Sequence, residues 1–122
     1  MLTEYRARAD EVHRRRHFLD DVLELFVWLD TDGTMTSFQL CYDRLGRERA
    51  ITWRLGSGFE HDAIDAGDDM PTKNRTPLAN PIADEIPFAR LMAEFDERSG
   101  TINGEIRETV RRQLLGGLSN TT

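Results

Sequence analysis

Residues 22–55 read VLELFVWLDTDGTMTSFQLCYDRLGRERAITWRL, and this stretch decides the fold. Apolar and polar residues alternate along three runs, which is typical of strands that bury one face. Asp32-Gly33 lies between the first two runs, and Asp-Gly is a preferred pair in two-residue type I′ hairpins. The pattern therefore predicts a three-stranded antiparallel meander.

Counting outward from the turn predicts which residues pair across the strands. A two-residue loop pairs the first two strands as follows: Leu29 with Thr36, Val27 with Phe38, Leu25 with Leu40, and Leu23 with Tyr42. A four-residue loop over residues 45–48 pairs the third strand as follows: Arg44 with Arg49, Tyr42 with Ile51, Leu40 with Trp53, and Phe38 with Leu55. Because side chains alternate with period two, one face of this meander is apolar throughout.

The other face of the meander mixes aromatic and hydrogen-bonding side chains. The predicted register places Phe26, Gln39 and Arg54 in one cross-strand row, with Trp28 in the next. Such a surface can bind a ligand or a partner, and it can equally be covered by the N-terminal segment of the chain itself. We predict a partner-binding surface at Phe26, Trp28, Gln39 and Arg54, occupied by another protein or by a second copy in a homodimer.

Length and composition limit the class of protein. The chain has 122 residues, which is the size of one domain, and we expect residues 1–118 to form it, with a disordered tail at 119–122. A formal net charge of −6 argues against a nucleic-acid surface. One cysteine, no apolar run of membrane-spanning length and no signal-peptide pattern at the N-terminus predict a cytoplasmic protein that does not bind membranes.

The segments on either side of the meander complete the predicted fold. Residues 1–21 fit both a helix and a strand, and a strand near 4–12 would extend the sheet. All four prolines lie in 70–87, which predicts an extended loop. Apolar residues at helical spacing follow Pro87, and a second helix is expected from Asn103 to Gly116-Gly117. The prediction is an α+β fold: a twisted antiparallel sheet of three to five strands with two C-terminal helices on its apolar face.

An acidic segment follows the meander and offers possible metal ligands. Residues 60–69 contain one histidine and five acids without Lys or Arg. Imidazole with carboxylates suits Mn, Fe or Zn, and carboxylates alone suit Mg or Ca. The spacing matches no established metal motif, and a solvated acidic turn explains it equally well. The predicted ligands of a divalent metal are His61, Asp62, Asp65 and Asp68.

Three phrases in this region carry a family resemblance. They are FQLCYD at 38–43, ERAITWR at 48–54 and GFEHDAIDAGDD at 58–69. This FQLCYD/TWR/GFxH pattern resembles a group of small uncharacterised bacterial proteins, over Val22 to about Asp69. The resemblance implies a bacterial, cytoplasmic origin and assigns neither an activity nor a catalytic residue.

The sequence thus leaves several functions open. No catalytic set is visible, and Cys41 has no activating neighbour, since Glu24 opposite it would raise the pKa of the thiol. We therefore expect a non-catalytic module that binds a protein partner or itself. The alternatives are a metal-assisted hydrolase that uses His61, Asp62 and Asp65, and an acidic inhibitor or immunity-type protein steered to a basic target by its charge.

Overall fold

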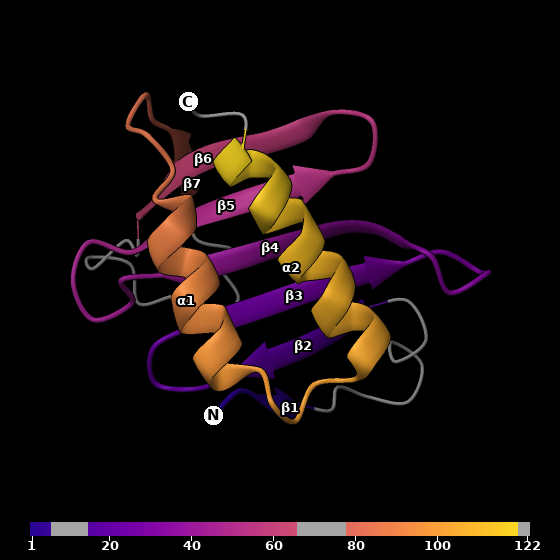
Figure 1. Ribbon diagram of the computed structural model, residues 1–122. Coiled ribbons are helices and arrows are strands. Elements are labelled where there is room, and N and C mark those ends of the chain that lie inside the picture. The colour runs from indigo at the N-terminus through magenta and orange to yellow at the C-terminus, as the bar shows by residue number, and fades with distance from the viewer. Residues whose placement is uncertain (6–14, 66–77, 120–122) are drawn as a thin grey trace.

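The computed structural model describes residues 1–5, 15–65 and 78–119 (Figure 1). Within them the chain forms a sheet of seven strands and two helices. The strands are β1 (Thr3–Tyr5), β2 (Arg15–Leu19), β3 (Glu24–Leu29), β4 (Met35–Tyr42), β5 (Arg49–Arg54), β6 (Gly58–Asp65) and β7 (Leu78–Pro81). The helices are α1 (Phe88–Arg98) and α2 (Gly104–Ser119).

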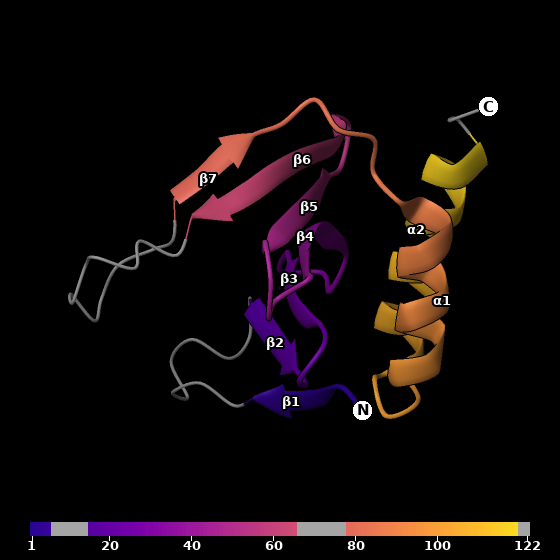
Figure 2. The ribbon, with the colours of Figure 1, turned by 90° about the vertical axis from the view of Figure 1, so that its left-hand side faces the viewer.

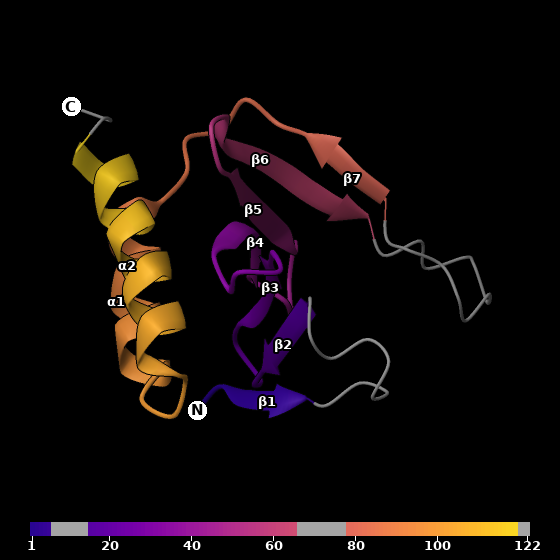
Figure 3. The same ribbon diagram turned by 90° about the vertical axis from the view of Figure 1, so that its right-hand side faces the viewer.

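Every strand in the described chain pairs antiparallel with its neighbour in sequence, so the sheet order is β1 to β7. The sheet twists, and both helices lie on the same side of it (Figure 2, Figure 3). The expected α+β fold with two C-terminal helices on one face is confirmed. The expected count of three to five strands is too low, because segments at both ends of the meander also pair with it.

The additional strands come from segments whose sequence was ambiguous or proline-rich. Thr3–Tyr5 and Arg15–Leu19 extend the sheet beside β3, while residues 6–14, which hold most of the expected strand at 4–12, lie outside the described residues. Gly58–Asp65 forms β6 rather than an acidic turn. Leu78–Pro81 pairs with β6 inside the region expected to be a loop, because an edge strand tolerates proline.

The turn between β3 and β4 differs from the predicted type I′ turn. Gly33 is the only residue of the turn with a positive φ, +85°, and Asp30 N–H donates to the Thr34 carbonyl at 2.8 Å. The carboxylate of Asp30 accepts the amides of Asp32 and Thr34, both at 2.9 Å. This is a three-residue loop with a left-handed glycine, and it shifts the register so that Leu29 pairs with Met35 instead of Thr36.

The register of β5 is shifted by two residues from the predicted one. The structure pairs Leu40 with Ile51 and Phe38 with Trp53. Strand β4 ends at Tyr42 because Asp43 adopts a left-handed conformation, with φ 53°, and the connection therefore spans residues 43–48. A shift of two preserves the faces, so the predicted apolar face is correct although the predicted pairs between β4 and β5 are wrong. Between β3 and β4, Leu25 pairs with Leu40 and Val27 with Phe38 as predicted.

The core lies between the apolar face of the sheet and the two helices. Its fully buried side chains come from both layers: Phe18, Leu23, Leu25, Val27, Phe38, Leu40, Ile51, Leu91, Phe95, Val110 and Leu114. Asn103 caps α2, since its side-chain oxygen accepts the amide of Glu105 at 2.9 Å. Helix α2 continues past Gly116 and Gly117 to Ser119, which corrects the predicted end at those glycines.

Candidate functional site

The face of the sheet opposite the helices, called here the open face, carries three cross-strand rows of side chains. The pairing of the strands gives the first row as Tyr5, His17, Phe26, Gln39, Thr52 and Glu60. The second row is Arg15, Trp28, Ser37, Arg54 and Gly58, and the third is Leu19, Glu24, Cys41, Ala50 and Asp62. No helix or strand among the described residues covers these rows (Figure 2), although Cys41, Ala50 and Thr52 within them are buried.

Aromatic rings form a continuous stack across the N-terminal half of the open face. The ring of His17 lies 4.3 Å from that of Phe26 with an interplanar angle of 10°. Tyr5 stacks on the other side of His17 at 5.7 Å, and Phe26 lies 6.1 Å from Trp28. Tyr5 is 62% exposed, and Phe26 and Trp28 are half-buried. A stack of this size in contact with solvent is typical of a binding surface.

Charged groups are distributed unevenly over the open face. The guanidinium of Arg15 lies 5.8 Å above the Phe26 ring, in cation–π contact. On the other half, Arg54 forms an ion pair with Glu60, and Asp62 lies on the same strand. Carboxylates lie on β6, as Glu60 and Asp62, and also on β3, where Glu24 lies 2.8 Å from Nε2 of His17 in the aromatic stack.

The four predicted partner-binding residues all lie on the open face. Trp28, Gln39 and Arg54 line one hollow of about 320 Å³, with Thr36, Ser37 and Thr52. Gln39 pairs with Thr52 and donates to its hydroxyl at 3.2 Å. Arg54 pairs with Ser37, whereas the predicted register placed Arg54 beside Gln39. Phe26 belongs to the adjacent aromatic stack. The prediction that these four residues share one face is therefore correct and their predicted order is not, while their role in partner binding stays a prediction.

Of the four predicted metal ligands, the two whose side chains the structure describes, His61 and Asp62, do not converge. His61 pairs with Ile51 and lies on the helix side of the sheet, whereas Asp62 pairs with Ala50 and lies on the open face. Consecutive residues of a strand point to opposite faces, so these two cannot bind one ion. Asp68 and the side chain of Asp65 lie outside the described residues. The positions of His61 and Asp62 therefore do not support a metal site in this segment, and that site stays a prediction.

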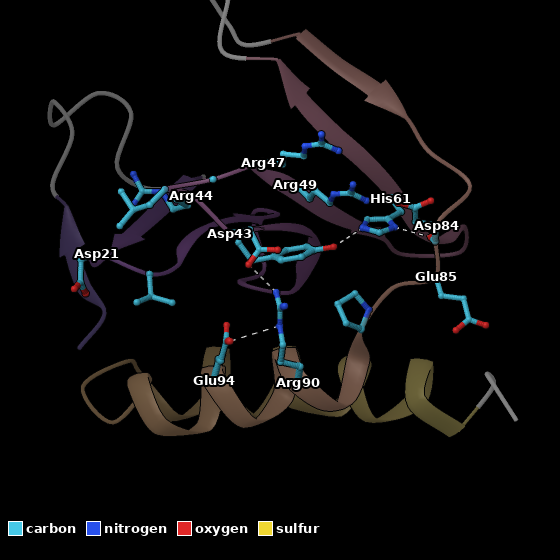
Figure 4. A pocket seen from close by; sticks show the side chains of 15 residues that line it. Asp21, Asp43, Arg44, Arg47, Arg49, His61, Asp84, Glu85, Arg90 and Glu94 are labelled. Atoms are coloured by element: carbon cyan, nitrogen blue, oxygen red, sulfur yellow. Dashed lines mark hydrogen bonds and ion pairs between the residues drawn. The ribbon is translucent and has the colours of Figure 1, made fainter.

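His61 is instead part of a buried contact at one end of the sheet. The hydroxyl of Tyr42 is hydrogen-bonded to Nε2 of His61, and Nδ1 of His61 lies 2.8 Å from the main-chain carbonyl oxygen of Asp84. Tyr42 is 2% exposed and His61 8% exposed. Both line a cavity of about 590 Å³ between the sheet and the start of α1 (Figure 4).

Arginines surround this cavity and are paired with carboxylates. Arg49 of β5 donates to Asp84 at 2.5 Å, and Arg90 of α1 donates to Asp43 at 2.9 Å. The guanidinium of Arg90 also lies 5.3 Å from the centroid of the Tyr42 ring. Burial raises the pKa of the Tyr42 hydroxyl, and the charges of Arg49 and Arg90 oppose that shift. The hydrogen bond from Arg49 lowers the pKa of Asp84.

A second cluster, Glu24, Cys41 and Glu48, has its donor atoms within 4.8 Å of one another. Cys41 is buried, and burial together with the neighbouring Glu24 raises the pKa of its thiol to about 12. Burial also raises the pKa of Glu48. Arg44 lies 3.9 Å from both carboxylates, so a guanidinium takes the position that a metal cation would need.

Sequence reasoning missed the Tyr42–His61 contact because it assigned His61 to a loop. Tyr42 and His61 are 19 residues apart and lie two strands apart, so only the full sheet register brings them together. Arg49, Asp84 and Arg90 come from three different elements, and no local spacing connects them. The alternation of Phe59, His61 and Ala63 along an apolar strand face is the signal that could have placed His61 against the core.

No family model, curated protein or solved structure significantly matches the chain. The resemblance to small bacterial proteins therefore stays a prediction. Among the helices of the described residues, none has the length and hydropathy that a membrane-spanning segment requires.

Proposed function

We propose that this protein is a non-catalytic binding module that associates with a second copy of itself through the open face. The observation that carries this proposal is the aromatic stack of Tyr5, His17, Phe26 and Trp28, which no described element covers. Rings that stack on one another cover each other's faces, so few exposed ring faces remain on which nucleic-acid bases could stack. Together with the net charge of −6, this favours a protein partner.

The shape of the open face supports a second copy as the partner. Two sheets with the same twist pack face to face with their strands nearly aligned, about 10 Å apart and about 30° from parallel. A two-fold axis along the central strand β4 produces this arrangement. It places β3 of one protomer over β5 of its partner, and β2 over β6.

The side chains are complementary in this arrangement. Trp28 lies over the partner subunit's Arg54, which forms a cation–π contact. His17 lies over the partner subunit's Glu60, and the long side chain of Arg15, one row away, reaches the same carboxylate. The bulky half of each open face thus meets the smaller, acidic half of the other. The hollow over Ser37 faces its own image across the axis, and bridging water can satisfy its polar groups.

Charge reversal on β6 tests the proposal. Glu60 is exposed and pairs only with Arg54 among the described side chains, so Glu60→Lys should leave the fold intact. It removes the ion pair between Glu60 and the partner subunit's Arg15 in both copies, each worth about 0.2–1 kcal/mol, and adds repulsion, so the dimer dissociation constant should rise by about tenfold. Sedimentation equilibrium over a range of concentrations measures this constant.

Two further variants make the test specific. The double variant Arg15→Glu/Glu60→Lys restores opposite charges across the proposed interface and should recover most of the lost affinity. Glu108→Lys makes the same charge change at an exposed position of α2, on the helix side, and should have no effect. A wild-type chain that stays monomeric at every concentration contradicts the proposal, and so does a dimer that Glu108→Lys weakens and Glu60→Lys does not.

A further inference from the structure

The cavity beside α1 has a floor built from two buried polar side chains. Tyr42 and His61 are both more than nine-tenths buried, yet both line a space of about 590 Å³. Ordinary core packing would place apolar side chains there. Figure 4 shows Asp84 behind the imidazole of His61 and Arg90 approaching from the helix, and the Tyr42 hydroxyl is hydrogen-bonded to that imidazole. This arrangement is independent of the open face, because it lies on the helix side of the sheet.

The hydrogen bonds of His61 define its tautomer. The main-chain oxygen of Asp84 can only accept, so Nδ1 of His61 carries the hydrogen in that 2.8 Å contact. In the neutral ring Nε2 is then an acceptor, and Tyr42 donates its hydroxyl hydrogen to it. If Nε2 gains a proton, it donates to the Tyr42 oxygen instead. The hydroxyl hydrogen of Tyr42 is then free to turn towards the cavity.

The charged groups around this pair differ in depth at the Arg49 ion pair. The side chain of Arg49 is 23% exposed, while its partner Asp84 is 62% exposed, so the guanidinium lies deeper and the solvated carboxylate contacts it from outside. Arg90 and its partner Asp43 are equally exposed, at 46%. A ligand with its own negative charge can replace these carboxylates, which return to water at little cost.

We propose that this cavity binds a small oxyanion, a carboxylate or phosphate group, between Arg49, Arg90 and the Tyr42 hydroxyl. Binding takes up one proton from solvent on Nε2 of His61, and Tyr42 turns its hydroxyl from His61 to the anion. Arg49 contacts the anion in place of Asp84, and Arg90 contacts it in place of Asp43. Guanidinium groups suit this role because they donate two parallel hydrogen bonds to such groups.

Other titratable groups also surround the Tyr42–His61 pair. The groups that face the pair or line the cavity are Asp43, Arg44, Arg47, Arg49, Asp84, Glu85, Arg90, Glu94 and Asp21. The arginines stay charged throughout the neutral range, and the hydrogen bond from Arg49 lowers the pKa of Asp84, so that carboxylate stays ionised near neutral pH. His61 is the one imidazole among these lining groups, and its Nε2 is already hydrogen-bonded to the Tyr42 hydroxyl.

Titration calorimetry with sulfate and acetate tests the proposal. Sulfate represents the phosphate class without titrating near neutral pH, and acetate represents carboxylates. Experiments in two buffers with different ionisation enthalpies measure proton uptake. We expect saturable binding at one site by at least one of these anions, uptake of one proton, and weaker binding as pH rises. Preference for one anion identifies the class of group that the cavity accepts.

Variants locate the site. Arg49→Gln and Arg90→Gln should each weaken binding by about tenfold or more, and Tyr42→Phe should also abolish the proton uptake. If Tyr42→Phe does not fold, nitrogen chemical shifts of His61 in the wild type give the same answer: one protonated nitrogen without anion and two with it. Arg111→Gln is a matched control on α2, with the same 46% exposure and one carboxylate partner, Asp96.

Three results would overturn the proposal. The first is the absence of saturable heat with both anions. The second is binding that Arg49→Gln and Arg90→Gln leave unchanged, or that Arg111→Gln weakens equally. The third is binding without a change in the protonation of His61, which would contradict the relay through Tyr42.

Discussion

At the scale of single residues, Asp20 shows how a buried charge supports this fold. Its carboxylate accepts the amides of Val22 and Leu23 at 2.7 and 2.8 Å and the Arg98 guanidinium at 2.9 Å. Burial favours the neutral carboxyl, but these hydrogen bonds outweigh it and lower the pKa of Asp20 to about 2. Asp20 thus connects the β2–β3 turn to the end of α1.

This depressed pKa gives a pH-dependent prediction. The folded pKa lies below the unfolded value, so the stabilisation is complete above about pH 4 and is lost as pH falls towards 2. Asp20→Asn should lower the free energy of unfolding at neutral pH by on the order of 2 kcal/mol. It should also flatten the loss of stability between pH 4 and 2, which urea unfolding at several pH values measures.

The neighbouring Asp21 provides the control for this prediction. It also approaches Arg98, at 3.4 Å, but its side chain is 85% exposed. Asp21→Asn should therefore change the free energy of unfolding by less than about 0.5 kcal/mol. Equal effects of the two substitutions would contradict the role given to the buried carboxylate.

At the scale of elements, two adjacent glycines of α2 have opposite roles. A Cβ added to Gly117 would lie 2.3 Å from the Phe88 ring of α1, whereas a Cβ on Gly116 would meet nothing within 4 Å. Helix propensity favours alanine at both positions. Gly117, however, has no Cβ, so α1 and α2 can pack closely at this position. This packing explains why α2 continues through two adjacent glycines, which usually end a helix.

The two glycines therefore form a matched pair of substitutions. Gly116→Ala should raise the free energy of unfolding by about 0.5–1 kcal/mol. Gly117→Ala should lower it by about 1–3 kcal/mol, because Phe88 must move from its packed position. Thermal and urea unfolding measure both. If both variants are stabilised, the close contact between Phe88 and α2 is incorrect.

The elements also show what the sequence could and could not predict. Alternation along residues 22–55 gave the correct faces, because the pleat alone determines them. The cross-strand pairs depend on loop conformation, and Asp30 and Asp43 determine those conformations through a side-chain bond and a left-handed φ that no alternation pattern reveals. The edge strands β1 and β7 depend on pairing with neighbours rather than on their own short sequences.

The candidate sites also differ in how far the sequence could predict them. The shared face of Phe26, Trp28, Gln39 and Arg54 was predicted because these residues belong to one strongly patterned stretch. The contact between Tyr42 and His61 requires the register of three strands and the position of α1, so it was not found. The acidic composition of residues 60–65 pointed to a loop, but the apolar partners of Phe59 and His61 in β5 hold that segment in the sheet.

At the scale of the whole molecule, the two faces of the sheet have separate roles. The helix side holds the core and, at its end, the cavity lined by Tyr42 and His61. The open face holds the aromatic stack and an asymmetric charge distribution. Because the sheet separates them, substitutions at Arg49 should leave self-association unchanged, and substitutions at Glu60 should leave anion binding unchanged.

The most direct test of self-association is an isotope-filtered NOE experiment on a mixture of labelled and unlabelled chains, which detects only contacts between protomers. A two-fold axis along β4 predicts cross-peaks between the indole protons of Trp28 and the side-chain methylene protons of the partner subunit's Arg54. It also predicts cross-peaks between His17 and the partner subunit's Glu60. A dimer that lacks both sets of cross-peaks, or a sample with no contact between protomers, would contradict the proposed interface.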